Sequence, residues 1–434
     1  MSKCINCQSC VKACTVVAGQ NVLKAKTVNG KPIIVTKTEA PLSETNCIGC
    51  GQCTLVCPVG AIVEHSHIKE ANKVLKNKNG KVCVAQIAPA VRINISESFG
   101  LPAGTVTTGK VVTALRMLGF DFVFDTNFGA DLTIVEEATE LAQQLNDPHH
   151  KMPMFSSCCP AWINYVQKSA PELIPQISSC RSPMSMLSNV IKSEFAQIKG
   201  IDPTNIVNIA IMPCTAKKDE IERPQLSTKD GKKATDIVIT TRELVKMIKS
   251  AKIDFKALED SPFDDLYSAS TGGASLFCAP GGVMEAAVRS AFQFLTGTRL
   301  QPIEFLPVRG KEGIKVGDLD AGSSKIRVAT VQGIANAMKL IEKVKNNDED
   351  VKGVKFVEVM ACPGGCVCGG GSPKAKTKKA TDQRLEATYN LDKNASLRVS
   401  QDNPAIQQLY KRFLGKYGSH LAHDLLHTEY KATK

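Results

Sequence analysis

Apolar residues follow two alternating patterns along most of the chain. Short runs of apolar and β-branched residues, typical of strands buried on both faces, read KVCVAQIAP (81–89), FDFVFDTN (120–127) and TNIVNIAIMPC (204–214). Longer stretches with helical spacing lie among them and read ADLTIVEEATELAQQL (130–145) and TTRELVKMIKSA (240–251). Strand followed by helix, repeated, predicts mostly parallel sheets flanked by helices, that is, an α/β fold.

The N-terminal part of the chain has a different pattern. In NVLKAKTVNGKPIIVTKT (21–38), apolar and β-branched residues flank Asn29-Gly30, a dipeptide typical of hairpin turns. We therefore expect a small domain over residues 1–78 and a large domain over 79–434. Within the large domain we expect a basic loop over 373–386 and a C-terminal helical segment over 400–434.

Composition narrows the class of protein. The chain has 434 residues, 43% of them hydrophobic, which suits one large domain or a few smaller ones. Its longest apolar run, VCVAQIAPAV (82–91), is about half of what a membrane span needs. Cys4 arrives before any signal-peptide core could fit. We expect a soluble protein of the reducing cytoplasm, or of an organelle matrix if a presequence was removed.

Cysteine is the most informative residue type. In a long, unsecreted chain, 17 cysteines indicate metal or redox chemistry more than disulfides. The spacing C-x2-C-x2-C-x3-C occurs twice, and in two-cluster ferredoxins each such motif lends its last cysteine to the other cluster. We therefore expect one 4Fe-4S cluster on Cys4, Cys7, Cys10 and Cys57, and a second on Cys47, Cys50, Cys53 and Cys14.

Structural zinc is the alternative for these eight cysteines. Zinc sites use four ligands, commonly as two C-x2-C pairs, and a doubled run of eight does not fit that pattern. Pro58 follows the second motif, whereas the first motif lacks this proline. That difference removes no ligand, so the first 78 residues are interpreted as a two-cluster electron relay.

Three cysteine-containing segments follow in the large domain. Ligands of parallel sheets bind at loops beyond the strand ends, and Cys214 directly follows a predicted strand. The segment MACPGGCVCGGG (360–371) likewise follows the strand VKFVEV (354–359). In FSSCCPAW (155–162), Cys158 and Cys159 are adjacent, an arrangement that rarely forms a disulfide because the closed ring is strained.

These segments resemble a known family. FSSCCPAW, MPCTAKKDE (212–220) and EVMACPGGCVCGGG (358–371) are similar, in order, to the three signature segments of the FeFe-hydrogenases, and the double ferredoxin motif and HLAHDLLHTEY (420–430) also match. The resemblance implies a two-cluster ferredoxin-like domain and a large two-lobed domain. The large domain would hold the H-cluster, a 4Fe-4S cubane bridged by one cysteine to a two-iron unit carrying CO, cyanide and a dithiolate.

The resemblance assigns different roles to the cysteines. The cubane ligands would be Cys159, Cys214, Cys362 and Cys366, with Cys366 bridging to the two-iron unit, a soft set suited to iron–sulfur. Cys158 matches the family's free thiol, which hands over a proton. The alternative is that these cysteines are small buried hydrophobes. That alternative suits Cys83, Cys180 and Cys278, to which no role is assigned.

The resemblance also implies a proton route. On a helical projection of 130–145, Glu137 lies at the border of the apolar arc, Glu140 lies on the polar side, and Glu136 faces away. Glu137 and Glu140 are three apart and therefore neighbours. A solvated acidic face is the alternative interpretation, but these two residues and Ser178 match the family's relay positions.

Further residues match positions around the cluster. Lys217 would pair with a cyanide nitrogen because a buried anion needs a cation, and Glu220 would be its helix neighbour. Residues that would contact or enclose the cluster are Ala88, Pro89, Ser182, Met212, Met360 and Phe277. Positions that depart from the better-known members are Cys368, Ser372, Met184 and Gln144, which bear on rate, catalytic bias and oxygen tolerance.

Two other patterns have ordinary interpretations. PGGVMEAAVRSA (280–291) lacks both G-x-G-x-x-G and a Walker lysine, so we expect a helix start packed near the cofactor and not a phosphate loop. The seven histidines show no metal-ligand spacing and are interpreted as surface or packing residues.

The formal charge of +12 leaves two interpretations of the surface open. One is ordinary solvated lysines, and the other is a basic surface that steers an acidic ferredoxin or flavodoxin. Nucleic acid is disfavoured because the basic residues are scattered and no binding motif accompanies them.

The expected function is reversible reduction of two protons by two electrons to H2, so the small substrates would be H+ and H2. Maturation proteins would deliver the two-iron unit. One rival is a related iron–sulfur assembly protein, which would not need Cys158, Glu137, Glu140 and Lys217. The other is a low-turnover hydrogen sensor, which would carry a signalling domain, and none is recognised after residue 373.

Overall fold

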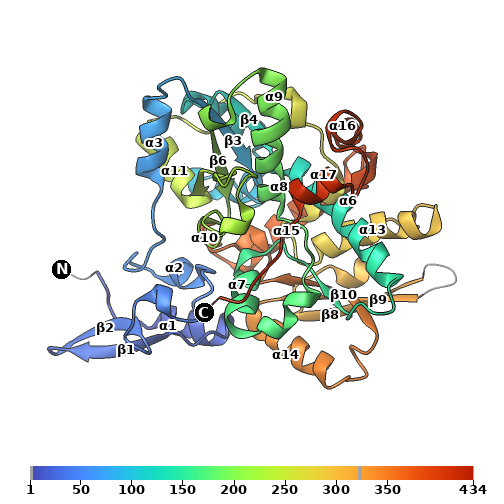
Figure 1. Ribbon diagram of the computed structural model, residues 1–434. Coiled ribbons are helices and arrows are strands. Elements are labelled where there is room, and N and C mark those ends of the chain that lie inside the picture. The colour runs from blue at the N-terminus through green and yellow to red at the C-terminus, as the bar shows by residue number, and fades with distance from the viewer. Residues whose placement is uncertain (1–2, 321–324, 434) are drawn as a thin grey trace.

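The computed structural model describes residues 3–320 and 325–433, whose strands form one hairpin and two four-stranded sheets (Figure 1). The strands are β1 Leu23–Val28, β2 Lys31–Thr36, β3 Val82–Ile87, β4 Phe122–Asp125, β5 Met154–Phe155, β6 Ile206–Met212, β7 Ile237–Thr240, β8 Ile314–Asp320, β9 Lys325–Gln332 and β10 Val354–Met360.

The helices cover both large sheets. They are α1 Ser9–Lys12, α2 Gln52–Val56, α3 Ile68–Lys76, α4 Val91–Asn94, α5 Thr108–Met117, α6 Thr126–Leu145, α7 Pro160–Ser169, α8 Pro183–Val190, α9 Ala196–Lys199, α10 Lys217–Glu220, α11 Thr241–Ser250, α12 Gly272–Leu276, α13 Gly282–Thr296, α14 Ile334–Lys345, α15 Lys378–Lys393, α16 Pro404–Leu409 and α17 His420–Leu426.

The first large sheet has the strand order β4–β3–β6–β7, and all of its pairings are parallel. Alternate residues of β3 point to opposite faces, so Cys83 and Ala85 pack with α5 and α11 while Val84 packs with α6 and α8. Because both faces are covered, the strand is almost entirely apolar, and its one polar residue, Gln86, is buried and donates to the Ser188 hydroxyl at 2.7 Å.

The second large sheet has the order β5–β10–β9–β8. Strand β10 pairs in parallel with β5 and β9, whereas β8 runs antiparallel to β9 at the edge. Helices α7 and α14 cover one face through Trp162 and Leu340, and α13 covers the other through Met284. The prediction of an α/β fold with mostly parallel sheets is confirmed.

Helix α6 joins the two lobes. Its Phe128 belongs to the apolar cluster beside β4, and its Ile134 belongs to the cluster beside β10. In Figure 1 the β3–β4–β6 sheet lies above the β8–β9–β10 sheet, and α6 lies to the right of the upper sheet and above β9. Its buried residues, continuous from Thr126 to Ala138, make it a central element, more deeply enclosed than a one-sided surface helix.

The N-terminal segment contains the expected hairpin. Strands β1 and β2 pair antiparallel around Asn29-Gly30, and both turn residues have positive φ. Helix α3, by contrast, packs into the core of the large domain, because Ala71 and Leu75 are buried against the first sheet. The domain boundary after residue 78 stays a prediction.

The basic stretch over 373–386 was expected to be a loop, and from Lys378 onward this is wrong. Residues Lys378–Lys393 form α15, which begins at a Thr377 side-chain cap and buries Arg384 and Leu385 on its inner face. Its lysines lie on the outer face, so the charge run is one side of an amphipathic helix.

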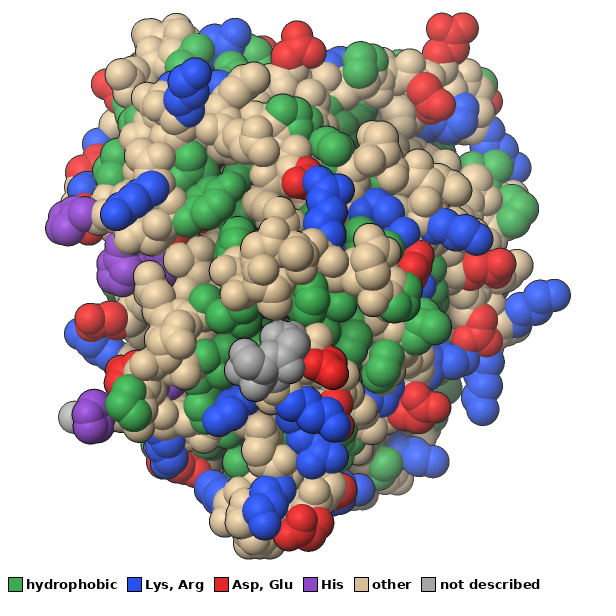
Figure 2. All heavy atoms as spheres, turned by 90° about the vertical axis from the view of Figure 1, so that its right-hand side faces the viewer, with side chains coloured by type: hydrophobic (Ala, Val, Ile, Leu, Met, Phe, Trp, Pro, Cys, Tyr) green, Lys and Arg blue, Asp and Glu red, His purple; other side chains and the backbone are tan. Residues whose placement is uncertain are grey.

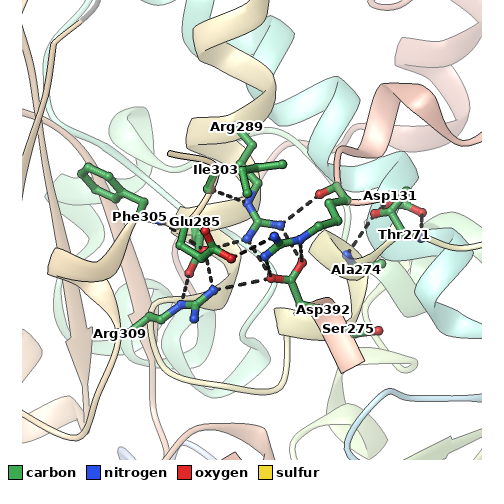
Figure 3. Close-up of polar contacts among 12 residues, drawn as sticks. Asp131, Thr271, Ala274, Ser275, Glu285, Arg289, Ile303, Phe305, Arg309 and Asp392 are labelled. Atoms are coloured by element: carbon green, nitrogen blue, oxygen red, sulfur yellow. Dashed lines mark hydrogen bonds and ion pairs between the residues drawn. The ribbon is translucent and has the colours of Figure 1, made fainter. Parts of the chain in front are cut away.

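A buried ion network ties α13 to α15 (Figure 3). Arg289 donates to Asp392 Oδ1 at 2.7 Å and to Glu285 Oε1 at 2.6 Å, and Arg309 donates to Glu285 Oε2 at 2.8 Å. Burial would raise the pKa of Asp392, but the hydrogen bonds from Arg289 and Arg398 outweigh it and hold that pKa below its usual range. Three guanidinium groups therefore neutralise two buried carboxylates.

Charge on one face of the molecule is mixed. Figure 2 shows the face that lies on the right of Figure 1, and there Lys and Arg side chains alternate with Asp and Glu. The net charge of +12 therefore does not form a single positive patch on this face.

Candidate active site

A cavity lies where the carboxyl ends of both large sheets meet. Its walls include Pro89 after β3, Cys214 after β6, Cys158 after β5 and Cys362 after β10. Loops beyond the carboxyl ends of parallel strands are the usual location of ligand sites in α/β folds. The three cysteine segments predicted from the sequence therefore converge on one place.

Four thiols line this cavity as one set: Cys159, Cys214, Cys362 and Cys366. The thiols lie close enough to interact electrostatically. After burial, the charges of Cys159 and Cys214 are among the causes that raise the pKa of Cys366. Burial is the largest cause of the raised pKa in each of the four thiols. Four buried thiolates are unfavourable without a compensating cation, so this donor set fits an iron–sulfur cubane.

Glycines let the backbone segments around the thiols pack closely. Gly369 and Gly371 come within van der Waals contact of the Cys214 loop, because a Cβ on Gly369 would lie 2.3 Å from the Pro213 carbonyl oxygen. A Cβ on Gly365 would lie 2.8 Å from the Cys278 carbonyl oxygen. The glycine run after Cys362 is thus required for the close approach of three loops around the cavity.

Cys158 also lines the cavity, yet its surroundings differ from those of its neighbour. Burial, followed by the charge of Glu137, raises the pKa of the Cys158 thiol well above its usual range. Cys159, in contrast, accepts a hydrogen bond from the Ala361 amide at 3.4 Å. A thiol kept protonated beside a carboxylate suits proton transfer, whereas a thiol facing a backbone donor suits a permanent thiolate.

Glu137 lies between Cys158 and the rest of the proposed route. Its side chain is 1% exposed, and among the described residues neither carboxylate oxygen has a hydrogen-bond partner of ordinary geometry. Burial, followed by the charge of Glu140, raises the pKa of Glu137 to about 8. A buried carboxyl group that titrates near neutral pH can both accept and release a proton under working conditions.

Glu140 is the next carboxylate along α6, and it is half-exposed. Ser178 donates its hydroxyl to Glu140 Oε2 at 2.6 Å, and the Ser179 amide and hydroxyl both donate to Oε1 at 2.9 Å. Glu137, Ser178 and Glu140 are thus brought together, from the buried side toward solvent.

The alternative of a solvated acidic face on α6 is wrong, because Glu136 and Glu137 are both about 1% exposed. Glu136 was expected to face away from the apolar side of the helix. Its side chain does point in another direction than that of Glu137. However, it is buried against the C-terminal segment, where it contacts Tyr410 and His427. A projection of one helix could not show this, because the covering segment comes from the far end of the chain.

Lys217 lines the cavity as predicted from the resemblance. Its ammonium group donates to Glu220 Oε2 at 2.7 Å and to Ser182 Oγ at 2.7 Å. Glu220 is therefore its helix neighbour, as expected. Ser182 begins α8 as its N-cap and is not among the residues that line the cavity, so its contact with the site runs through Lys217.

The remaining predicted wall residues do line the cavity: Ala88, Pro89, Met212, Met360 and Phe277. Sequence reasoning missed Thr126, Ala130, Pro183 and Cys278, which line it too. Cys278 follows Phe277 directly, and this adjacency was the available signal. Helix α13 begins at Gly282, so the expectation of a helix start in this segment is confirmed, whereas its packing near the cofactor stays a prediction.

The four positions that differ from the better-known family members lie in different parts of the site. Met184 lines the cavity, whereas Ser372 and Cys368 are not among its lining residues. Ser372 accepts a hydrogen bond from Asn94 at 2.8 Å, and Cys368 lies 3.6 Å from the Thr381 hydroxyl. Gln144 donates to Glu140 Oε1 at 3.3 Å.

The N-terminal cysteines form two further sets. A second cavity is lined by one expected set, Cys4, Cys7, Cys10 and Cys57. The other expected set is Cys14, Cys47, Cys50 and Cys53. Cys14, Cys47 and Cys53 pack beside the hairpin, and after burial the charges of these three raise the pKa of Cys50. The last cysteine of each motif therefore lies with the other motif, the exchange expected for two cubanes.

Cys50 connects these sets to the main cavity, which it also lines. Thr215 donates its hydroxyl to the Gly49 carbonyl at 2.6 Å, and a Cβ on Gly370 would lie 2.1 Å from the Cys50 carbonyl oxygen. The loop of the relay domain is thus packed directly on the loops that carry Cys214 and Cys366.

Two compact four-cysteine sets that lead to a third, buried one define an iron–sulfur redox protein. Three family descriptions match the chain: "4Fe-4S dicluster domain" over residues 3–62, "Iron only hydrogenase large subunit, C-terminal domain" over 81–370, and "Iron hydrogenase small subunit" over 378–433. The chain belongs to the iron-only (FeFe) hydrogenase family, whose cofactors are 4Fe-4S clusters and the H-cluster.

Individual relatives agree with this. The chain is 43% identical over 435 residues to Iron hydrogenase 1 of Clostridium pasteurianum, covering 99% of this chain and 75% of that protein. It is also 31% identical to cytosolic iron-sulfur assembly component 3 of Bos taurus, covering 91% and 85%. A variant structure of [FeFe]-hydrogenase HydA1 from Chlamydomonas reinhardtii superimposes with a TM-score of 0.76 at 40% identity, covering 85% of this chain and 99% of that one.

The described helices include none that is both long and apolar enough to cross a membrane.

Proposed function

We propose that this protein is an active hydrogenase that interconverts two protons and two electrons with H2. Electrons would come from an acidic ferredoxin or flavodoxin in the cytoplasm and pass the two N-terminal clusters. The H-cluster, when bound, supplies the redox chemistry and the site at which protons and H2 react. The chain supplies the thiol ligands, an enclosed cavity and a route for protons.

The residues proposed to hold the cofactors are the twelve thiols described above. Cys366 would be the bridging ligand, and Lys217 would face the anionic ligands of the two-iron unit. This role for Lys217 is supported by its position on the cavity wall and by its contacts with Glu220 and Ser182, which fix its ammonium group. A buried cation beside a cavity that receives an anion compensates the loss of hydration.

The proton route is the observation that carries the proposal. Cys158 would exchange a proton with Glu137, which would exchange it through Ser178 with Glu140 near the surface. Each group in this series is suited to its place: a protonated thiol, a buried carboxyl group with pKa about 8, a hydroxyl, and a half-exposed carboxylate. A protein that only stores or delivers clusters has no use for such a series.

An iron–sulfur assembly function is the second candidate, favoured by the identity of 31% to an assembly component. The two candidates differ in the two-iron unit. Infrared spectroscopy of protein produced together with the maturation proteins would show CO and cyanide bands for a hydrogenase, and H2 production from reduced viologen would accompany them. Clusters without these bands and without H2 would favour assembly.

A hydrogen sensor with the same cofactor is the third candidate. It would show the same infrared bands but little turnover, so the H2 assay separates it from an enzyme. We infer that turnover is high, because the complete series from Cys158 to Glu140 supports rapid proton exchange.

A further inference from the structure

Beyond Glu140, a second series of hydrogen-bonded groups runs deeper into the C-terminal segment. Ser179 Oγ, which donates to Glu140 Oε1 at 2.9 Å, also lies 2.8 Å from His427 Nδ1. On the other side of the ring, His427 Nε2 lies 2.9 Å from Glu136 Oε2. A hydroxyl and an imidazole therefore connect two carboxylates of the same helix.

This series is enclosed along most of its length and ends beside solvent. The side chains of His427 and Glu136 are 5% and 0% exposed. The Gly418 amide donates to both oxygens of Glu136 at 3.1 and 3.2 Å, and Gly418 itself is exposed. A proton that reaches Glu136 is therefore one residue from the surface, on a different side of α6 from Glu140.

Counting hydrogens shows that the series holds a transferable proton. Ser179 has a single hydroxyl hydrogen. When that hydrogen forms the bond to Glu140, Ser179 Oγ can only accept from His427, so His427 Nδ1 must carry a hydrogen and donate it. The contact between Nε2 and Glu136 Oε2 then requires one more hydrogen, carried by the ring or by the carboxyl group. Imidazole is the side chain that can take a proton at one nitrogen and release another from the opposite one.

The other neighbour of Glu140 offers no such continuation. Gln144 donates to Glu140 through its amide, and among the described residues its own oxygen has no hydrogen-bond partner. A carboxamide neither gains nor loses a proton at ordinary pH. Of the side chains that bond to Glu140 on its outer side, Ser179 is therefore the one that leads to another titratable group.

We propose that Ser179, His427 and Glu136 form a second proton exit that branches from Glu140 and opens at Gly418. This inference rests on the proposed function, because it extends the route from Cys158 to Glu140. The three residues are proton-relay residues and do not touch the cavity.

One inward passage balances as follows. Glu136 takes a proton from solvent and gives it to His427 Nε2, and His427 Nδ1 gives its proton to Ser179 Oγ. Ser179 gives its original hydroxyl proton to Glu140 Oε1. The ring then carries its hydrogen on Nε2, and the Ser179 hydroxyl points to Nδ1. Outward passage is the reverse: Glu140 returns a proton to Ser179, Ser179 gives one to Nδ1, and Nε2 gives one to Glu136, which restores the first arrangement. No electron moves, and no covalent bond between heavy atoms forms or breaks.

A purely structural role is the competing explanation for His427. The same region contains other bonds that hold the C-terminal segment, including Tyr410 to Glu136 and the Thr428 amide to the Ser179 carbonyl at 2.8 Å. The test must therefore compare variants that interrupt the series with a variant that only loosens its surroundings.

Glu136→Gln keeps the size and shape of the side chain, but it replaces one acceptor oxygen with an NH2 donor and removes the ability to carry a proton. Ser179→Ala interrupts the series between Glu140 and His427, and Ser179→Thr restores the hydroxyl. Tyr410→Phe is the matched control, since it removes one bond to Glu136 and leaves the series continuous. The measurements on the fully matured enzyme are H2 production with saturating reduced viologen, its solvent deuterium isotope effect, and the melting temperature.

We expect Glu136→Gln and Ser179→Ala to lower turnover by about tenfold, less than the roughly 100- to 10,000-fold of a group at the reacting centre, because Glu140 keeps direct contact with solvent. Their isotope effect should rise as proton entry becomes rate-limiting, and Ser179→Thr should recover most of the rate. The KM for viologen and the turnover of Tyr410→Phe should stay unchanged.

Two results would overturn the branch: unchanged turnover in both interrupting variants, or equal losses in all variants, Tyr410→Phe included, with an unaltered isotope effect. Glu140→Gln separates this outcome from failure of the proposed function. If Glu140→Gln abolishes turnover while Glu136→Gln does not slow it, the main route stands and the branch falls. If Glu140→Gln has no effect, the main route itself is wrong.

Discussion

Gly370 lies so close to Cys50 that a methyl group on its Cα would sit 2.1 Å from the Cys50 carbonyl oxygen. A contact this tight between backbones cannot be relieved by moving a side chain. Gly370→Ala should therefore displace the relay-domain loop from the main cavity and lengthen the gap that electrons cross. We expect ferredoxin-driven H2 production to fall strongly, whereas production from a small viologen that reaches the large domain directly should fall less.

The control for this variant is Gly353→Ala. Gly353 has positive φ and open space around its Cα, so an alanine there costs some stability without touching the interface between the domains. Equal losses with both electron donors in Gly370→Ala would mean that the contact serves folding and not electron transfer.

Cys158→Ala should retain iron and lose nearly all turnover. The thiol lines the cavity beside Glu137, and no other described side chain there combines this position with an exchangeable proton. The loss should be roughly 100-fold or more, the usual contribution of a positioned acid or base. Cys158→Asp should recover part of the rate because a carboxyl group also exchanges protons. Full activity of Cys158→Ala at full iron content would assign the proton donor elsewhere.

Glu137 should make the stability of the protein depend on pH. Its folded-state pKa of about 8 lies above the ordinary glutamate value of about 4.3, so the folded state binds this proton more tightly than the unfolded state. The stabilising contribution is therefore complete below the ordinary value and is lost as pH rises through about 8. Glu137→Gln has no carboxyl group to ionise, so it does not lose this contribution. The melting temperature of the variant, relative to that of the wild type, should therefore rise as pH increases from 5 to 9, measured in steps of roughly one pH unit.

Glu386→Gln is the control for the pH series. Glu386 lies on the exposed face of α15, so its carboxylate is in water in both states and the offset between variant and wild type should stay constant. A constant offset for Glu137→Gln as well would show that Glu137 is not held in the protonated form.

Electrostatic steering should depend on lysines of the relay domain. Lys12, Lys31 and Lys37 are exposed near the N-terminal cysteine sets. Raising salt from about 0.1 M to about 1 M shortens the Debye length from roughly 10 Å to roughly 3 Å, which should weaken ferredoxin-driven turnover at sub-saturating carrier. A cationic viologen is repelled by the same surface, so its rate should stay level or rise.

Replacing Lys12, Lys31 and Lys37 with glutamine should weaken the apparent affinity for an acidic carrier and flatten its salt dependence. The matched variant carries glutamine at Lys199, Lys411 and Lys416, three exposed lysines of the large domain. If both triple variants behave alike, the net charge of +12 serves solubility and does not guide a partner.

Arg289→Met should destabilise the large domain severely. The guanidinium group is 1% exposed and bonds Glu285 and Asp392, both fully buried, so its removal leaves carboxylates without their main counter-charge (Figure 3). Breaking a buried ion pair from one side typically costs about 3–5 kcal/mol. Thermal or denaturant unfolding measures this, with Lys311→Met as the comparison, because Lys311 pairs with Asp382 at the surface and should matter little.

The sequence was sufficient for features that are set locally. Buried strands such as β3 and β6 appear as mainly apolar runs, each with one polar residue, and the hairpin appears through Asn29-Gly30, because these signals depend on a few neighbouring residues. The cysteine segments could be placed at one cavity because parallel strands bring their carboxyl ends to a common edge.

Features set by distant contacts could not be found in this way. The burial of Glu136 depends on Tyr410, His427 and Gly418, nearly 300 residues further along the chain. The lysine-rich stretch over 373–386 was expected to be a loop because its charge suggested solvation, yet α15 buries Arg384 through bonds to Glu97 and to the Val367 carbonyl. Ser182 matches a cofactor position but reaches the cavity only through Lys217.

The four cavity thiols come from both lobes, since Cys214 follows a strand of the first sheet whereas Cys159, Cys362 and Cys366 follow strands of the second. A cluster held by all four is therefore a cross-link that closes long stretches of chain, much as a disulfide does. The stability of the contact between the two lobes should therefore depend on the iron content of the protein. An oxidant that strips the cluster would leave the lobes joined by packing and by connecting segments such as α6, and protease sensitivity would then report cofactor damage.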